Sequence, residues 1–478
     1  MIKRERKTFV LLVGLITIIY FLINGYFLLK FPPPWPDETE YADVALNLIE
    51  KNQYKMSLHP FSELVNKTVY TYPPLMFYVV AASFKIFGFS LFSQRIISMI
   101  AGVLFLLLFY IFINKYIFKN SFLSLIPIFL LVTDLSFTQS TRISRPEIYI
   151  MLLTILGYFA LLKNNFRGYF LSGLFFGLSA LIQPYGVIGF IVACIYTFLK
   201  KKSNSIKKII FMTIPFIIAF IFWMWRINFN FQFFIEAMKL QGLRKSIEPS
   251  FFYQIFHEQN IYSALLSIVY LISSSIIVFL FLKKNSINSK FFLVLNIIIY
   301  WYFVIKGKQF WYFVYPIPWL YTGLILLITS FINKKKYFKS IIPLFILILI
   351  FFINLRLTAT YLKRFWNNNY SYKLFTKIIT KQIPNNSRVF ISTIPNPYYE
   401  LKKNKTLKIF LFPALPGEEK EYLMTLENSD YIIYNGDHDL VYGNLLKKYI
   451  EKEKGFKIDI NNGLNQYKAV VLRMQPKN

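Results

Sequence analysis

The sequence predicts an α-helical polytopic membrane protein that carries a small α/β domain at its C-terminal end. Of its 478 residues, 56% are hydrophobic and 20% are aromatic, a composition that is rare among water-soluble proteins of this length. Apolar runs of membrane-spanning length recur through most of the chain. Most lysines lie in short loops between these runs, so lysines in cytoplasmic loops explain the formal net charge of +31. Binding of nucleic acid would need a soluble basic face, so we expect no nucleic-acid partner.

The first apolar run, residues 8–30, follows a basic tail, and no small-residue cleavage site comes after it. We expect an uncleaved signal anchor with a cytoplasmic N-terminus, so that Phe31 emerges on the outer side. The next apolar stretch, residues 73–85, is too short to span and is interrupted by Lys85. We interpret it as an interfacial helix, because a span here would move the basic loops out of the cytoplasm. These loops are residues 114–119, 200–208, 283–290 and 334–339.

About eleven spanning helices fit this arrangement, and their odd number places the C-terminal segment outside the cell membrane. From about Lys363 the composition changes to alternating strand-like and helical stretches, which predicts a small α/β domain. We therefore expect two domains, residues 1–362 and 363–478. The expected spans are 8–30, 95–113, 121–138, 147–162, 168–182, 184–199, 209–225, 260–282, 291–305, 311–331 and 340–358. The expected strands are 387–393, 407–413, 430–436 and 467–474, and the expected C-terminal helices are 417–429 and 442–455.

Acidic residues are scarce and unevenly placed along the chain. The first 364 residues contain twelve, and on this topology every one except Glu5 lies in an outer loop or at an outer helix end. Solvated loop charge explains many of them singly. Their clustering on one face, beside arginines at the same helix ends, is typical of a site for an anionic group. The acids are Asp37, Glu38, Glu40, Asp43, Glu50, Glu63, Asp134, Glu147, Glu236, Glu248 and Glu258, and the arginines are Arg95, Arg142, Arg145 and Arg244.

The densest acidic cluster lies directly after the first apolar run, in FPPPWPDETEYADVALNLIEKNQY, residues 31–54. Its four prolines prevent the first helix from continuing and hold Asp37 and Glu38 outside the membrane. The apolar residues that follow have amphipathic spacing, which predicts a short helix lying on the membrane surface. Asp37 is expected at the N-cap, where a carboxylate caps well. Capping alone would explain Asp37 but not the adjacent Glu38.

At this point the sequence resembles polytopic glycosyltransferases of the GT-C fold, of the protein O-mannosyltransferase and aminoarabinose-transferase type. PDETEYADVALNL resembles their first outer-loop motif, and further elements follow in family order over about the first 330 residues. Each element alone is weak, but the series is specific. The further elements are YTYPPLMFYVVAASFKIFG, SQRIISMIAG, STRISRPEIYIMLL, GLSALIQPYGVI, FFIEAMKLQGLR and KQFWYFVYPIPWLYTG.

The resemblance implies transfer of a sugar from a polyprenyl-phosphate donor to an acceptor hydroxyl on a protein, a lipid or a surface glycan. It puts Asp37 in the role of general base, with Glu38 orienting the acceptor or supporting the loop. Arginine and lysine side chains would stabilise the departing phosphate. The candidates for donor and phosphate binding are Arg95, Arg142, Arg145, Glu147, Lys306, Lys308 and Tyr312, and those for the acceptor loop are Tyr72, Glu236 and Arg244.

The sequence departs from the family pattern at a few positions, and other classes of protein stay open. Tyr72 and Gln183 stand where many relatives carry a basic residue, and none directly precedes Tyr312, which puts the identity of donor or acceptor in question. A transporter or flippase of lipid-linked sugars would place ionisable residues at the membrane midplane, and no such pattern or inverted repeat is seen. A non-catalytic membrane subunit is the third alternative. The sequence establishes no cofactor. A divalent metal at Asp37 and Glu38 stays open, because some relatives bind one, but these two residues alone give no full ligand set.

Overall fold

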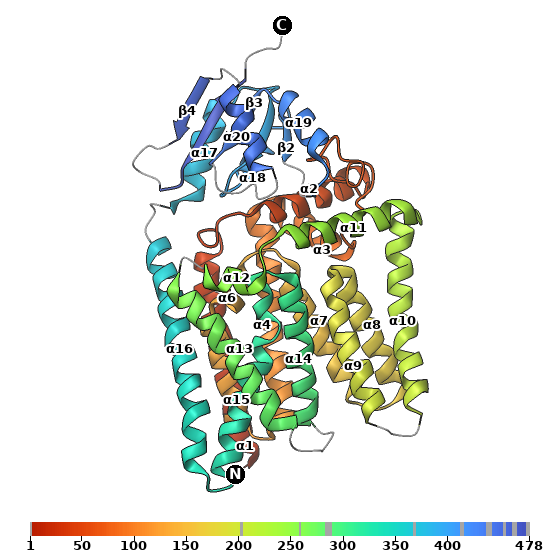
Figure 1. Ribbon diagram of the computed structural model, residues 1–478, viewed down its shortest axis with the longest axis vertical. Helices are drawn as coiled ribbons and strands as arrows, with labels where there is room; N and C mark the ends of the chain where they lie inside the picture. The colour runs from red at the N-terminus through yellow and green to blue at the C-terminus, as the bar shows by residue number, and fades with distance from the viewer. Residues whose placement is uncertain are drawn as a thin grey trace. The chain divides into compact units, whose positions relative to one another are not determined.

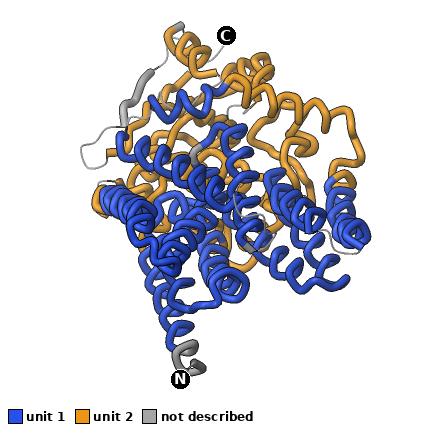
Figure 2. Tube along the Cα trace, turned by 60° about the horizontal axis from the view of Figure 1, so that its bottom comes forward, with its two compact units in different colours: residues 1–25, 98–223, 248–362 blue, residues 26–97, 224–247, 363–478 orange. Residues whose placement is uncertain are grey.

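The computed structural model describes most of the chain as helices, followed by one small sheet (Figure 1). The chain divides into two compact units, of which the first comprises residues 1–25, 98–223 and 248–362 (Figure 2). The second unit combines residues 26–97, 224–247 and 363–478. The two consecutive domains expected from the sequence stay a prediction. The described residues are 2–200, 204–257, 260–282, 289–366, 370–411, 415–435, 442–452, 456–460 and 466–474, so Glu258 lies outside them.

Long apolar helices dominate the part of the chain before residue 367, as predicted. Among the described residues, six helices are long and apolar enough to cross a membrane, or seven if a bent pair counts as one broken span. The other four predicted spans fall on shorter apolar helices, so the count of eleven and the side of each loop stay predictions. The longer helices are α1 (Ile2–Phe27), α4 (Leu91–Ile113), α10 (Ser205–Arg226), α13 (Ile261–Leu282), α14 (Ser289–Gly307) and α16 (Tyr337–Trp366). The bent pair is α5 (Ser121–Thr133) with α6 (Leu135–Arg142), and the shorter helices are α7 (Pro146–Leu161), α8 (Phe166–Ile182), α9 (Val187–Leu199) and α15 (Ile317–Ile332).

The bend of 66° between α5 and α6 has a local cause at Asp134. Its carboxylate caps α6 by accepting the backbone N–H of Phe137 at 3.0 Å, and it also accepts the hydroxyls of Tyr270 and Tyr321, each at 2.5 Å. Asp134 is fully buried. This acid is therefore part of the packing of the first unit, and not a loop charge as its sequence position suggested.

The C-terminal sheet has five strands in the order β2-β1-β3-β5-β4. Strand β1 pairs in parallel with β2 and β3, whereas β5 is antiparallel to β3 and β4. Four strands were predicted, and β4 was missed. The strands are β1 (Arg388–Ser392), β2 (Lys408–Leu411), β3 (Tyr431–Tyr434), β4 (Phe456–Ile460) and β5 (Ala469–Arg473). The accompanying helices are α17 (Tyr372–Gln382), α18 (Tyr398–Leu401), α19 (Glu419–Glu427) and α20 (Gly443–Lys452).

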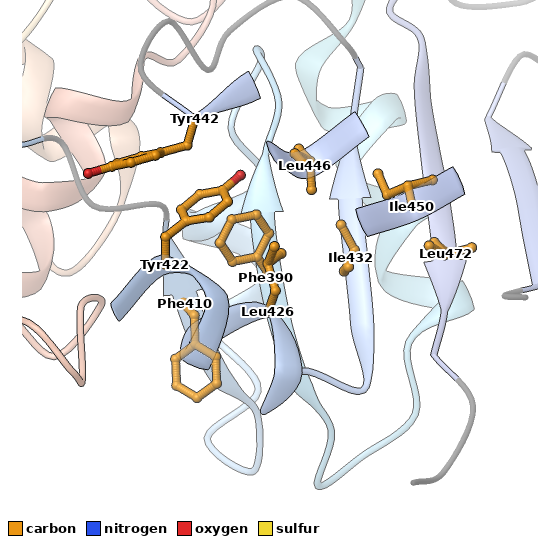
Figure 3. Packing of buried hydrophobic residues seen from close by; sticks show 9 residues of the cluster. All are labelled: Phe390, Phe410, Tyr422, Leu426, Ile432, Tyr442, Leu446, Ile450 and Leu472. Carbon is orange, nitrogen blue, oxygen red and sulfur yellow. The ribbon is translucent and has the colours of Figure 1, made fainter. Parts of the chain in front are cut away.

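Helices α19 and α20 contribute to the core of this sheet (Figure 3). Phe390, Ile432 and Leu472 extend from the central strands and meet Leu426 of α19 and Leu446 of α20. Burying one such side chain is worth about 1.5–3 kcal/mol. The apolar side chains of these strands and helices therefore form one core. The predicted α/β character of the C-terminal segment is confirmed.

Three further helices belong mainly to the second unit: α2 (Pro36–Lys51), α3 (Leu75–Phe87) and α11 (Phe231–Ile247). The two short helices expected after the first span are therefore present, although their position at a membrane surface stays a prediction. A helix lying on a membrane would leave a polar face in water, whereas residues 38–47 of α2 are all buried. Residues after 393 cover this helix: the Asn396 N–H donates to the Pro34 carbonyl at 3.0 Å, and Tyr399 donates to the Glu38 carbonyl at 3.2 Å.

Candidate functional site

Asp37 lies in the first turn of α2, which begins one residue earlier at Pro36. Proline suits this position because its missing N–H would have no helical partner. The expectation that Asp37 is the N-cap is wrong, because the N-cap is Trp35. The next acid, Glu38, accepts the Trp35 N–H at 3.1 Å. Asp37 is half-buried, and its charge is favoured at this helix end by the backbone dipoles.

Glu38 and Arg95 form a fully buried ion pair, with 0% exposure of both side chains. Arg95 Nε donates to Glu38 Oε1 at 2.8 Å, and Nη2 donates to Oε2 at 2.6 Å. The remaining nitrogen, Nη1, donates to the carbonyls of Leu28 and Pro32, both at 2.8 Å. This guanidinium therefore ties the end of α1 and the proline loop to the start of α2. The predicted phosphate role of Arg95 is untested, but in this geometry its donors are directed at protein oxygens.

Two residues predicted from sequence, Arg244 and Asp37, each lie within electrostatic range of a third, Tyr72. Arg244 forms a hydrogen bond with the Tyr72 hydroxyl. Burial raises the pKa of Tyr72, the charges of Glu40 and Asp37 raise it further, and Arg244 opposes them. Glu236 is exposed on α11. The arrangement therefore places a partly accessible carboxylate close to a phenol and a guanidinium.

Arg226, at the C-terminal end of α10, is a site candidate that sequence reasoning missed. Its guanidinium carbon lies 5.4 Å from the ring centre of Tyr54 and 5.6 Å from that of Tyr78. Its Nε atom is buried and has no hydrogen-bond partner among the described residues. The available signal was its place at a helix end, which is the feature that singled out the other arginines. An arginine held by rings with a donor unused is suited to an anionic ligand.

Two further acids of α2 are connected to the C-terminal segment of the same unit, Glu40 through His59 and Asp43 directly. Glu40, 5% exposed, lies 3.3 Å from His59 Nε2, and His59 Nδ1 is 3.2 Å from the Leu411 carbonyl. Ser62 donates to Glu418 nearby. Burial alone would lower the pKa of His59, but the hydrogen bond to Glu40 and the charges of Glu40 and Glu418 outweigh it and raise that pKa.

Asp43 is 1% exposed and has partners from both ends of the second unit. It accepts the Ser57 N–H at 2.5 Å and the Tyr398 hydroxyl at 3.2 Å, with Lys402 at 3.7 Å. Burial raises the pKa of Asp43, and Lys402 opposes this shift. A cavity of about 20 Å³ beside Glu40 and His59 has room for roughly one water molecule. Among the described residues, no group of three or more His, Cys, Asp or Glu side chains is placed to hold a metal ion.

The remaining predicted residues lie in the first unit, where Arg145, Glu147 and Tyr312 share one neighbourhood. Arg145 Nη2 donates to Glu147 Oε1 at 3.2 Å, and its guanidinium stacks 4.6 Å from the Trp311 ring centre. Tyr312 stacks on Tyr185 at 4.4 Å, and Tyr185 is within electrostatic range of Glu147. These rings and charges form a second polar aromatic site.

Other predicted cations of the first unit lie in different surroundings. Arg142 is 1% exposed, and its Nε donates to Asn24 Oδ1 at 2.6 Å. Lys308 donates to the Glu248 carbonyl at 2.8 Å, and Lys306 is exposed. A role in donor binding stays a prediction for all of them.

Comparisons with known proteins agree with this architecture. Residues 71–225 match the family model of dolichyl-phosphate-mannose-protein mannosyltransferases. The crystal structure of ArnT from Cupriavidus metallidurans bound to undecaprenyl phosphate is similar, with a TM-score of 0.58 and 10% identity over 97% of this chain and 99% of ArnT. The archaeal oligosaccharyltransferase AglB from Archaeoglobus fulgidus, in complex with an inhibitory peptide and a dolichol-phosphate, has a TM-score of 0.55 and 13% identity over 98% of this chain and 75% of AglB. No curated protein sequence matches the chain.

These findings define the class of fold: the chain has the GT-C-type membrane fold of these solved structures, and its residues 71–225 are similar to dolichyl-phosphate-mannose-protein mannosyltransferases. Within that class, the sequence match to the mannosyltransferase family covers residues 71–225, which include Tyr72, Arg95 and the Arg145–Glu147 pair. The predicted resemblance to GT-C glycosyltransferases is therefore confirmed.

Proposed function

We propose that the chain transfers a sugar from a polyprenyl-phosphate-linked donor to an acceptor hydroxyl, with Asp37 as the general base. One observation carries the proposal. Of the four acids in the first two turns of α2, Glu38, Glu40 and Asp43 are buried against the Arg95, His59 and Tyr398 side chains, whereas Asp37 is partly accessible. Its accessible carboxylate is therefore the one that an acceptor is able to reach.

The chemistry requires one proton transfer and one displacement. The Asp37 carboxylate takes the proton of the acceptor hydroxyl, the acceptor oxygen bonds to the anomeric carbon, and the bond from that carbon to the donor phosphate breaks. The electron pair leaves with the polyprenyl phosphate. Arg244 and Arg226, both in the same compact unit as Asp37, supply positive charge for this phosphate. Glu38 and Arg95 hold the loop, and so act on position only.

The donor class is supported by the matched family's name and by the lipid phosphates bound to ArnT and AglB. The donor-binding roles of Arg142, Arg145, Glu147, Lys306, Lys308 and Tyr312, and the acceptor-loop role of Glu236, stay predictions. The acceptor is a hydroxyl of a protein, a lipid or a surface glycan. The proposal keeps Asp37 and residues 363–478 on the outer side of the cell membrane, as the charge distribution predicts.

The test is sugar transfer by purified protein from a panel of radiolabelled polyprenyl-phosphate sugars to membrane acceptors. Asp37→Asn should lower the rate about 10²–10⁴-fold, since that is the usual contribution of a positioned general base. Glu50→Gln is the matched control, because Glu50 lies on the same helix and is exposed. If Asp37→Asn turns over at the wild-type rate, Asp37 is not the general base. If the wild-type protein transfers sugar from none of these donors, polyprenyl-phosphate sugars are excluded as the donor class.

A further inference from the structure

A second cavity, of about 310 Å³, opens within the second unit and is separate from Asp37 and Tyr72. Its volume is at the lower end of the range that binds small ligands. The lining combines three lysines, Lys30, Lys373 and Lys403, with one acid, Glu400. Lys403 is paired with Glu400 at 2.7 Å, so Lys30 and Lys373 give the cavity its net positive charge.

The apolar part of the lining comes from the ends of three helices that are long enough to cross a membrane. Leu29 follows α1, Phe92 lies in the first turn of α4, and Phe365 lies in the last turn of α16. Leu29 is 42% exposed and Phe92 is 45% exposed. Apolar side chains at helix ends, next to lysines, are the arrangement found where a helix leaves the hydrocarbon layer and meets head groups.

The cavity wall is also connected to the first loop. Tyr399, which is 1% exposed and lines the cavity, donates to Gln94 Oε1 at 2.7 Å and to the Glu38 carbonyl at 3.2 Å. A second lining residue, Tyr372, donates to the Asn396 carbonyl at 2.9 Å, and the Asn396 N–H bonds to Pro34. A ligand that orders these two tyrosines therefore stabilises the loop that positions Asp37.

We propose that this cavity binds the phosphate head group of an anionic membrane phospholipid, with Lys30 and Lys373 facing the phosphate and the acyl chains lying along Leu29 and Phe92. A phosphate complements the two lysines, and the open apolar rim suits chains that continue into the bilayer. The bound lipid is a structural ligand and not a substrate, so the proposal is independent of the glycosyl-transfer reaction.

The experiment titrates phosphatidylglycerol, phosphatidylcholine or inorganic phosphate into delipidated full-length protein, with binding followed by native mass spectrometry and by melting temperature. Phosphatidylglycerol should bind and raise the melting temperature, and phosphatidylcholine should bind much more weakly. In Lys30→Ala/Lys373→Ala, phosphatidylglycerol binding should weaken about thirtyfold, since each basic residue near a membrane surface contributes roughly a fivefold change.

The matched control is Lys377→Ala/Lys381→Ala, which removes the same charge from exposed positions on α17. The control should bind phosphatidylglycerol like the wild type, and equal loss in both double variants would overturn the site. Equal stabilisation by inorganic phosphate alone would overturn the lipid assignment. If the Lys30→Ala/Lys373→Ala protein is unstable, Lys373→Glu is tested in its place. Charge reversal at this exposed position should abolish phosphatidylglycerol binding, and unchanged binding would refute the proposal.

Discussion

Replacing Arg95 by alanine removes a guanidinium that donates to four oxygen atoms of the first loop. The variant leaves the buried Glu38 carboxylate and the carbonyls of Leu28 and Pro32 without this partner. Removing one member of a buried ion pair typically costs about 3–5 kcal/mol. In a domain of roughly 150–250 residues each kcal/mol lowers the melting temperature by about 2–4 °C, so we expect a decrease of roughly 6–20 °C.

The assay is thermal unfolding of detergent-purified protein, with polyprenyl-phosphate binding measured on the same samples. Glu38→Leu/Arg95→Leu should recover much of the loss, because apolar replacement of a whole buried pair is often close to neutral. Arg167→Ala, at an exposed position of α8, serves as the control and should change stability by less than about 0.5 kcal/mol. An unchanged melting temperature in Arg95→Ala, together with weaker polyprenyl-phosphate binding, would refute the structural role and restore the phosphate role.

Three further changes test the rest of the second unit. Because the pKa of His59 is raised above 6.5, the stabilisation by its charged form is complete below that pH and is lost as the pH rises through the higher folded value. The melting temperatures of wild type and His59→Gln should therefore converge as the pH rises above 6.5, and a constant difference would contradict this. Phe390→Ala should cost the sheet about 3–5 kcal/mol in urea unfolding, and a wild-type midpoint would show that Phe390 is not a core residue. Arg244→Ala should lower the transfer rate about 10²-fold with partial recovery in Arg244→Lys, whereas full activity would exclude a contact with the phosphate.

The helices and most of the sheet were predictable because their signals are local. An apolar run of about twenty residues is sufficient to predict a span, and β1, β3 and β5 alternate or cluster apolar residues over four or five positions. Strand β4 was missed because Phe456–Ile460 directly follows a lysine-rich helical stretch and has only three apolar residues. The short spans were harder, since α9 has 13 residues and its length alone does not distinguish a span from a packed helix.

The site was predictable in its residue types but not in its pairings. Clustered acids and helix-end arginines indicated an anionic site, and Asp37 and Arg244 each lie within electrostatic range of Tyr72. The sequence contains no local sign that Arg95 pairs with Glu38 or that Asp43 contacts Tyr398, because these partners are 57 and 355 positions apart. Contacts over such separations arise from the tertiary fold. They direct the donors of Arg95 at protein oxygens, and its phosphate role stays a prediction.

The second unit is built from three separate segments, residues 26–97, 224–247 and 363–478, and this has a consequence for the order of synthesis. Ribosomes complete the loop with Asp37 long before the C-terminal partners of Asp43 and His59 exist, since Tyr398, Lys402 and Leu411 are translated near the end. Acids that are buried in the finished protein therefore lack their C-terminal contacts during most of translation. The loop that positions Asp37 should therefore not reach its final geometry until the last quarter of the chain, residues 363–478, has been made.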